Sequence, residues 1–177
     1  PAVNVTKNCA PDPNQVGGVS TCTIVVTNNS SADSPNLENG TIVDSLSGNL
    51  LDGANTDVVN STCAAVLPTG GSCTITTART ILASDPNPVV NTVTVHYNPV
   101  GFPNDITDFA SASVNLVAPM ITVTKAASPL SKIGDDVTYT IEICNAGVLP
   151  VTRTSVVDAL LGGDISGSFA ASLAPGQ

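Results

Sequence analysis

Short runs in which apolar and polar residues alternate recur along the chain, and clusters of Pro, Gly, Asn and Asp separate them. In "NTVTVHY" (Asn91–Tyr97), the Val and Tyr side chains share one face of an extended segment, and the Thr and His side chains share the other. Such alternation is typical of half-buried β-strands. We expect at least seven strands in the first two thirds of the chain, near Val3–Asn8, Ser20–Thr27, Asn39–Asp44, Asp57–Ser61, Cys73–Ala78, Asn91–Tyr97 and Thr107–Leu116.

Composition agrees with this pattern. Val and Thr make up almost a quarter of the residues, and β-branched side chains pack well on a pleated sheet but lose freedom in a helix. No segment has the apolar spacing of an amphipathic helix. The sequence therefore predicts an all-β protein.

Four stretches of the chain occur twice in the same order, and the spacing between the copies shortens along the sequence. Preserved order with shorter loops indicates tandem copies of one domain. We expect domains at residues 1–118 and 119–177. The matching pairs are "VNVTK" with "ITVTK" (Val3–Lys7, Ile121–Lys125), "TCTIVVTN" with "TYTIEICN" (Thr21–Asn28, Thr138–Asn145), "TIVDSL" with "SVVDAL" (Thr41–Leu46, Ser155–Leu160), and "LPTGG" with "LAPGQ" (Leu67–Gly71, Leu173–Gln177).

The first copy has the strand number and length of an immunoglobulin-like β-sandwich, although the chain has no Trp and so lacks the Cys–Trp–Cys core of antibody domains. The second copy stops at "LAPGQ", where the first continues with further strands. We therefore expect the second sandwich to be incomplete in residues 119–177. A longer chain or a neighbouring subunit would supply its closing strands, and the longer chain is favoured.

Residues 123–177 carry the pattern "VTK…P…GDDVTYTIEICNAG…V…VVDAL…LAPGQ". This pattern resembles a domain-of-unknown-function family that recurs in tandem in very large bacterial and archaeal cell-surface proteins. The first copy is a looser version in which Cys22 stands where the second has Tyr139. The resemblance implies a β-sandwich building block for stalks, adhesins, surface layers or fibres, without an active site.

Charge and hydropathy exclude two kinds of partner. The formal net charge is −9, and the five basic residues form no cluster, so we expect no nucleic-acid binding. No apolar run approaches the roughly 20 residues of a membrane span.

The chain opens at Pro1 without a signal peptide, which fits a mature product or an excised segment. Low charge with many Thr, Ser and Asn residues is typical of secreted β-rich proteins, so we expect an extracellular or cell-surface location.

The five cysteines do not have the spacing of a metal site. A catalytic thiol is also poorly supported, because a cysteine nucleophile needs a base and His96 is the only histidine in the sequence. A disulfide role is favoured. Cys9 and Cys22 could meet across neighbouring strands, and Cys63 and Cys73 flank a turn. We favour these two pairs over the other pairings of the same four residues. Cys144 is left unpaired, or its partner lies outside the chain.

Other candidate positions have structural interpretations that we prefer. Asp44 and Asp158 end equivalent strands, where a carboxylate that accepts backbone N–H bonds is favoured over a metal ligand. Asp135 and Asp136 suggest a turn in preference to a calcium site. His96 is expected on the solvent face. Five sequons offer glycosylation sites, at Asn4, Asn28, Asn29, Asn39 and Asn60.

Lys7 and Lys125 continue the apolar stripes of equivalent strands. An inward lysine beside an asparagine and a carboxylate is the arrangement of self-made isopeptide crosslinks in surface fibres. Asn115 lies on the wrong face to serve as that asparagine. The favoured interpretation is therefore a lysine whose stem packs at the sandwich edge while its ammonium reaches water.

We predict a non-enzymatic structural building block of an extracellular fibre, stalk or surface layer. It needs no cofactor, metal or catalytic residue, and its partners are copies of itself or further repeats of a longer chain. The alternative is an adhesin-type module that recognises glycan or protein through loops at one end of a sandwich. Five aromatic residues are too few for an obvious sugar-binding platform, which favours the first function.

Overall fold

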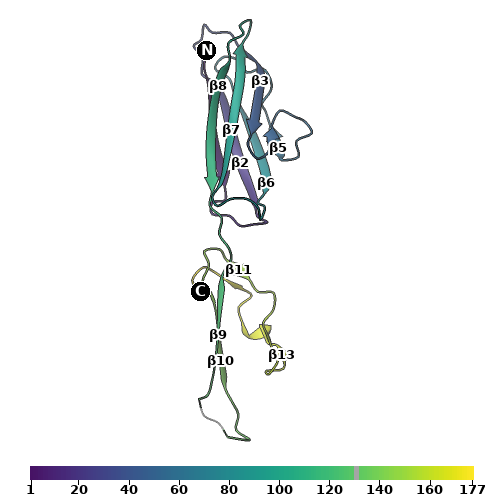
Figure 1. Cartoon of the computed structure of the whole chain (residues 1–177), viewed down its shortest axis with the longest axis vertical. Helices are drawn as coiled ribbons and strands as arrows, with labels where there is room; N and C mark the ends of the chain where they lie inside the picture. Colours follow the sequence, from purple (N-terminus) through teal and green to yellow (C-terminus); the bar gives the residue numbers. More distant parts are fainter. Residues whose placement is uncertain (130–131) are drawn as a thin grey trace. The chain divides into compact units, whose positions relative to one another are not determined.

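The computed structural model describes residues 1–129 and 132–177, and these fall into two compact units, Pro1–Leu116 and Val117–Gln177. Both units are built from antiparallel strands, and the described residues contain no α-helix (Figure 1). The all-β prediction is confirmed. No helix in the described ranges is long and apolar enough to cross a membrane.

The first unit contains two four-stranded sheets. One has the order β1 (Val3–Ala10), β2 (Val19–Asn28), β6 (Ser72–Thr80), β5 (Val58–Ser61). The other has the order β4 (Gly48–Asn49), β3 (Leu37–Asp44), β7 (Val89–Pro99), β8 (Ile106–Val114). Each of the seven segments expected from the sequence forms a strand, with ends shifted by a few residues. The two-residue strand β4 was not expected.

The inward residues of both sheets form a main apolar core, and Cys9, Cys22 and Val114 form a smaller buried cluster. Ile24 and Ile75 from the first sheet and Ile42, Val93 and Val95 from the second are all fully buried. On β7 the buried residues alternate with half-exposed ones, which is the period-2 pattern that the sequence shows. The two sheets therefore face each other across a single hydrophobic layer.

Two disulfides lie in the first unit. Cys9 and Cys22 are directly opposite each other on β1 and β2, and Cys63 in the loop after β5 joins Cys73 on β6. These are the two pairs that the sequence analysis favours. Cys144 is a free thiol.

The described residues of the second unit form three two-stranded pairings. β9 (Ile121–Ala127) pairs with β10 (Tyr139–Asn145), β11 (Val151–Thr152) with β14 (Ser172–Leu173), and β12 (Val157–Asp158) with β13 (Gly163–Asp164). A short 3-10 turn covers Ser166–Ser168. Every residue of β9 is exposed, whereas β1 in the first unit buries alternate residues.

Candidate functional site

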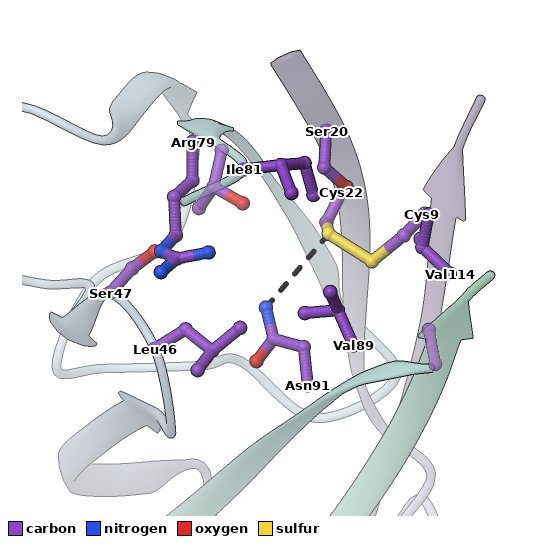
Figure 2. A pocket seen from close by; sticks show the side chains of 12 residues that line it. Cys9, Ser20, Cys22, Leu46, Ser47, Arg79, Ile81, Val89, Asn91 and Val114 are labelled. Atoms are coloured by element: carbon purple, nitrogen blue, oxygen red, sulfur yellow. Dashed lines mark hydrogen bonds between the residues drawn. A yellow bond between two sulfur atoms is a disulfide. The ribbon is translucent and has the colours of Figure 1, made fainter. Parts of the chain in front are cut away.

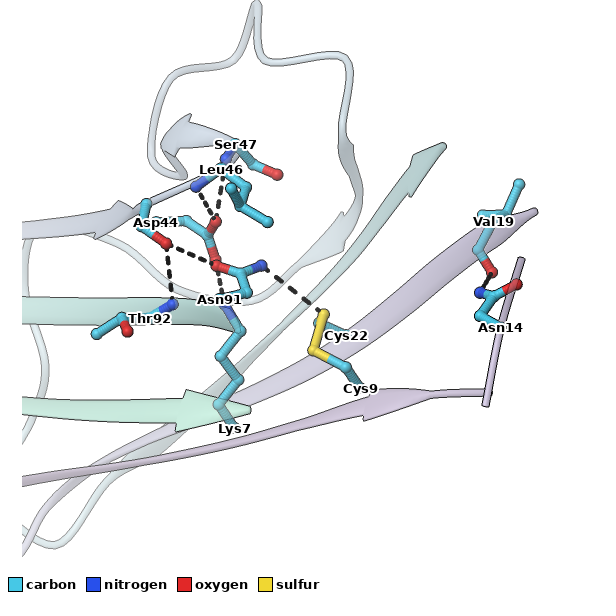
Figure 3. Close-up of a disulfide and its surroundings, with 11 residues drawn as sticks. Lys7, Cys9, Asn14, Val19, Cys22, Asp44, Leu46, Ser47, Asn91 and Thr92 are labelled. Carbon is cyan, nitrogen blue, oxygen red and sulfur yellow. Dashed lines mark hydrogen bonds and ion pairs between the residues drawn. A yellow bond between two sulfur atoms is a disulfide. The ribbon is translucent and has the colours of Figure 1, made fainter. Parts of the chain in front are cut away.

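The most unusual charged group in the first unit is a buried ion pair between Lys7 on β1 and Asp44 at the end of β3 (Figure 3). The lysine Nζ contacts Oδ2 of the aspartate, and both side chains have no exposed surface. β1 and β3 belong to different sheets, so this pair spans the core. Their strand partners Ile24 and Val93 are fully buried.

The expectation that the Lys7 ammonium reaches water is therefore wrong. The sequence places Lys7 on the inward stripe but does not reveal that Asp44 lies opposite it on the other sheet. Burial lowers the pKa of Lys7, and the hydrogen bond and charge of Asp44 only partly oppose this effect. The ammonium form is thus less favoured than in water.

The other carboxylate oxygen of Asp44 is held by the turn that follows β3. Backbone N–H groups of Leu46 and Ser47 donate to Oδ1 at 2.9 and 3.0 Å. This is the turn-shaping role expected from the sequence. The adjacent Ser45 donates from its hydroxyl to Oδ1 of Asn91 at 3.1 Å, and accepts from the backbone N–H of Thr92 at 2.9 Å.

The same charged pair occurs in the second unit, between Lys125 on β9 and Asp158 on β12, at 2.5 Å. Leu160 and Leu161 donate their backbone N–H groups to Asp158 Oδ1, at 3.0 and 3.2 Å. The hydrogen bond from Lys125 is the main reason why the pKa of Asp158 is lowered. Here, however, the lysine side chain is 36% exposed and lies over the Tyr139 ring, 4.4 Å from its centroid.

A second repeated feature is a buried asparagine at the end of β2 and of β10. Asn28 donates from Nδ2 to the carbonyl of Leu67 at 3.0 Å, and Asn145 donates to the carbonyl of Leu173 at 3.1 Å. Both asparagines are fully buried. Their main chains also accept from Gly70 and Gly176 in the following Pro-Gly turns, at 3.0 and 2.9 Å. This role was not expected from the sequence, although both asparagines stand at matching positions of the repeat.

The second unit contains a cleft of about 450 Å³ with largely apolar walls. Its lining includes Ile121 and Val123, which are 55% and 58% exposed. The residues at the equivalent positions of the first unit, Val3 and Val5, are 9% and 4% exposed because they belong to the core. Further cleft residues are Ile143, Val151, Val156, Val157, Phe169 and Leu173.

The cavity described in the first unit is much smaller. It encloses about 10 Å³ beside the Cys9–Cys22 disulfide, with Arg79 and Asn91 among its walls (Figure 2). A space of this size has room for about one water molecule. It is too small for a substrate or cofactor.

The remaining candidates lie at the surface. His96 is half-exposed, and its Nδ1 lies 3.0 Å from the carboxylate of Asp105, which is exposed. Asp135 and Asp136 are exposed, and no group of His, Cys, Asp or Glu within residues 1–129 and 132–177 has the arrangement of a metal site. The free thiol of Cys144 lies near the carboxylate of Glu142. The pKa of this thiol is raised, mainly by desolvation and to a smaller extent by the negative charge of Glu142.

The sequons differ in accessibility. Asn4, Asn29, Asn39 and Asn60 are exposed. In the folded protein, Asn28 is buried, and the Nδ2 atom that would carry a glycan is hydrogen-bonded to the carbonyl of Leu67.

No protein-family model and no curated protein matches the chain. Among solved structures, it is similar to the crystal structure of a protein of unknown function from Porphyromonas gingivalis W83. The two share 14% identity with a TM-score of 0.37, over 99% of this chain and 79% of the other. A likeness at this level supports no conclusion about fold or function.

Proposed function

We propose that the chain is a non-enzymatic building block of an extracellular fibre, stalk or surface layer, made of tandem immunoglobulin-like domains of the surface-repeat type. The observation that carries this proposal is an open apolar cleft in the second unit. This unit repeats the Lys–Asp pair and the buried asparagine of the first unit, yet residues equivalent to core positions line the cleft.

The first unit indicates what would fill this cleft. There, β7 and β8 pair next to β3, and Val93 and Val95 on β7 pack into the same core as Val5 on β1. Strands with alternating apolar residues, like those of β7, would bury Ile121 and Val123 in the same way. A further repeat or a neighbouring copy would supply these strands. Adding strands to an open sheet edge is an established mode of subunit association.

Two further features support this proposal. The disulfides Cys9–Cys22 and Cys63–Cys73 fit an oxidising environment. Exposed apolar walls would favour aggregation if the cleft stayed open, so a lasting occupant is favoured over a transient ligand.

Electron microscopy of the native material tests the proposal, and we expect regular fibres or arrays. Val123→Asp should disrupt the assembly because it places a charge on the cleft wall. Val148→Asp is the matched control, since Val148 is 60% exposed and does not line the cleft. Native material that contains only isolated molecules would contradict the proposal, as would equal assembly of both variants.

A further inference from the structure

The covalent links in the first unit leave its two sheets unconnected. Cys9–Cys22 joins the neighbouring strands β1 and β2, and Cys63–Cys73 joins the loop after β5 to β6. All four of these strands belong to one sheet. The contact of Lys7 with Asp44 instead crosses from that sheet to the other.

The contact has the geometry of an acyl-transfer reaction. Lys7 Nζ lies against Oδ2 of Asp44, and therefore beside the carboxyl carbon. Oδ1 accepts two backbone N–H bonds, from Leu46 and Ser47. Two such donors stabilise the negative charge that develops on this oxygen when a nucleophile attacks the carbon, as an oxyanion hole does.

We propose that Lys7 and Asp44 condense into an isopeptide bond that crosslinks the two sheets. A proton passes from the Lys7 ammonium to Oδ2, which leaves a neutral amine and a carboxylic acid. Nζ then forms a bond to Cγ of Asp44, and the charge on Oδ1 is held by the two N–H groups. A second proton moves from nitrogen to the Oδ2 hydroxyl, the Cγ–Oδ2 bond breaks, and one water molecule leaves. The ion pair thus supplies every atom and proton of the amide and the water.

Burial favours this reaction in two ways. In water, hydration of the ammonium and carboxylate keeps the two groups as ions, and a site with no exposed surface removes much of this stabilisation. The pKa of Lys7 is lowered by the same desolvation, which increases the share of the nucleophilic amine. The fold also holds the reacting groups in contact, and well-oriented intramolecular reactions gain effective molarities on the order of 10⁵ M or more.

The Lys125–Asp158 pair provides an internal comparison. It has the same residue types and the same two backbone donors to Oδ1, but its lysine side chain is 36% exposed. Water can hydrate this ammonium. We therefore expect Lys125 and Asp158 in this chain to remain an ion pair.

Mass spectrometry of the denatured, reduced and alkylated protein tests the proposal. We expect a mass that is lower than the sequence mass by one water molecule. Trypsin should fail to cut after Lys7, so that residues 8–79 stay attached to the segment that carries Lys7. Fragmentation of this product should locate the link at Lys7 and Asp44.

Lys7→Met and Asp44→Ala should each restore the full mass, whereas Lys125→Met should keep the deficit of one water. The wild-type result is decisive even if a variant folds poorly. Full wild-type mass with normal cleavage after Lys7 would overturn the proposal. Loss of ammonia in place of water would also overturn it, because the acceptor would then be an asparagine. A water lost at Lys125 would refute the role assigned to burial.

Discussion

Asn28 is a buried polar side chain whose amide has specific partners. At the end of β2, its Nδ2 donates to Leu67 and its Oδ1 accepts from the backbone of Ser30 at 3.2 Å. The asparagine thereby ties the Pro-Gly turn that starts at Leu67 to the strand end. Its neighbour Asn29 is exposed, so two adjacent asparagines have different structural roles.

Replacement of Asn28 by Ala should lower the free energy of unfolding by about 1–3 kcal/mol, because both hydrogen bonds are lost at a buried site. Denaturant unfolding monitored by circular dichroism would measure the change. Asn29→Ala is the matched control and should stay within about 0.5 kcal/mol of wild type. Equal effects of the two substitutions would show that the buried amide does not hold the turn.

The ion pair between Arg79 and Asp85 makes the stability of the first unit depend on pH. Arg79 donates to both carboxylate oxygens, at 2.8 and 2.9 Å, and this hydrogen bonding is the main reason why the pKa of Asp85 is lowered from 3.8. A lowered native pKa means that the pair stabilises the fold above about pH 4. The contribution is lost as the pH falls from there through the native pKa.

We expect Asp85→Asn to cost about 0.5–1 kcal/mol at pH 7, the range of a well-formed surface ion pair. The difference between wild type and variant should shrink as the pH falls below about 4. Urea unfolding at pH 7 and at several lower pH values provides the measurement. A stability difference that is unchanged at low pH would show that the charge of Asp85 contributes nothing.

Single residues also mark the limit of what the sequence reveals. The turn-shaping role of Asp44 was predictable, because a short carboxylate at a strand end has local backbone partners. Its contact with Lys7 was not, because the partner lies 37 residues away on the other sheet. Alternation assigns a residue to a face but does not give the register between sheets that face each other.

At the scale of elements, β3 is shaped by a bulge. Its register against β7 shifts between Glu38 and Thr41, and Asn39 has a positive φ of 54°. Gly40 lies within the bulge beside the buried ring of Tyr97. A Cβ at this position would lie 2.2 Å from a ring carbon, so the sheet accommodates Tyr97 only because residue 40 has no side chain.

Gly40→Ala should therefore destabilise the protein by about 1–3 kcal/mol through overpacking. Gly53→Ala is the control, since a Cβ there meets no atom within 4 Å. Thermal unfolding would rank the two variants. An unchanged melting temperature for Gly40→Ala would mean that Tyr97 moves aside at little cost.

The elements themselves were largely predictable. Each of the seven expected strands has alternating apolar residues or β-branched runs between turn residues, and these signals are local. β4 has only two residues, too few to show any alternation. The pairing of β3 with β7 across 50 or so residues of chain has no local signal, which is why the sheet order needed the structure.

Removal of the Cys9–Cys22 disulfide tests how much β1 depends on its link to β2. The bond closes a loop with a sequence separation of 13, for which loop entropy gives a stabilisation of about 3 kcal/mol. The double variant Cys9→Ala, Cys22→Ala should lose about this amount in denaturant unfolding. Cys144→Ala should lose little, because Cys144 forms no disulfide. Similar losses in both variants would contradict a stabilising role of the bond.

At the scale of the whole molecule, the two units differ in how completely their strands are covered. β1 and β9 are edge strands that each pair with one neighbour, β2 and β10. β1 also packs against β8 and buries Val3, Val5 and Cys9, whereas all seven residues of β9 are exposed. That the second sandwich is incomplete stays a prediction, which the protection of the strands around the cleft can test.

This difference should appear in amide hydrogen exchange. Exchange of amide hydrogens in β1 and β2 requires opening of the packed core, so the free energy of this opening should approach the global free energy of unfolding. The amides of β9 and β10 should exchange through local opening, which has a much lower free energy. In native assembled material, strands that fill the cleft should raise the protection of β9 and β10 towards that of β1 and β2. Mass-spectrometric exchange on the isolated chain and on the assembly would compare the two pairs directly. If β9 in the isolated chain is protected as well as β1, the second unit is stable without added strands. If the protection of β9 and β10 is the same in the assembly as in the isolated chain, nothing occupies the cleft.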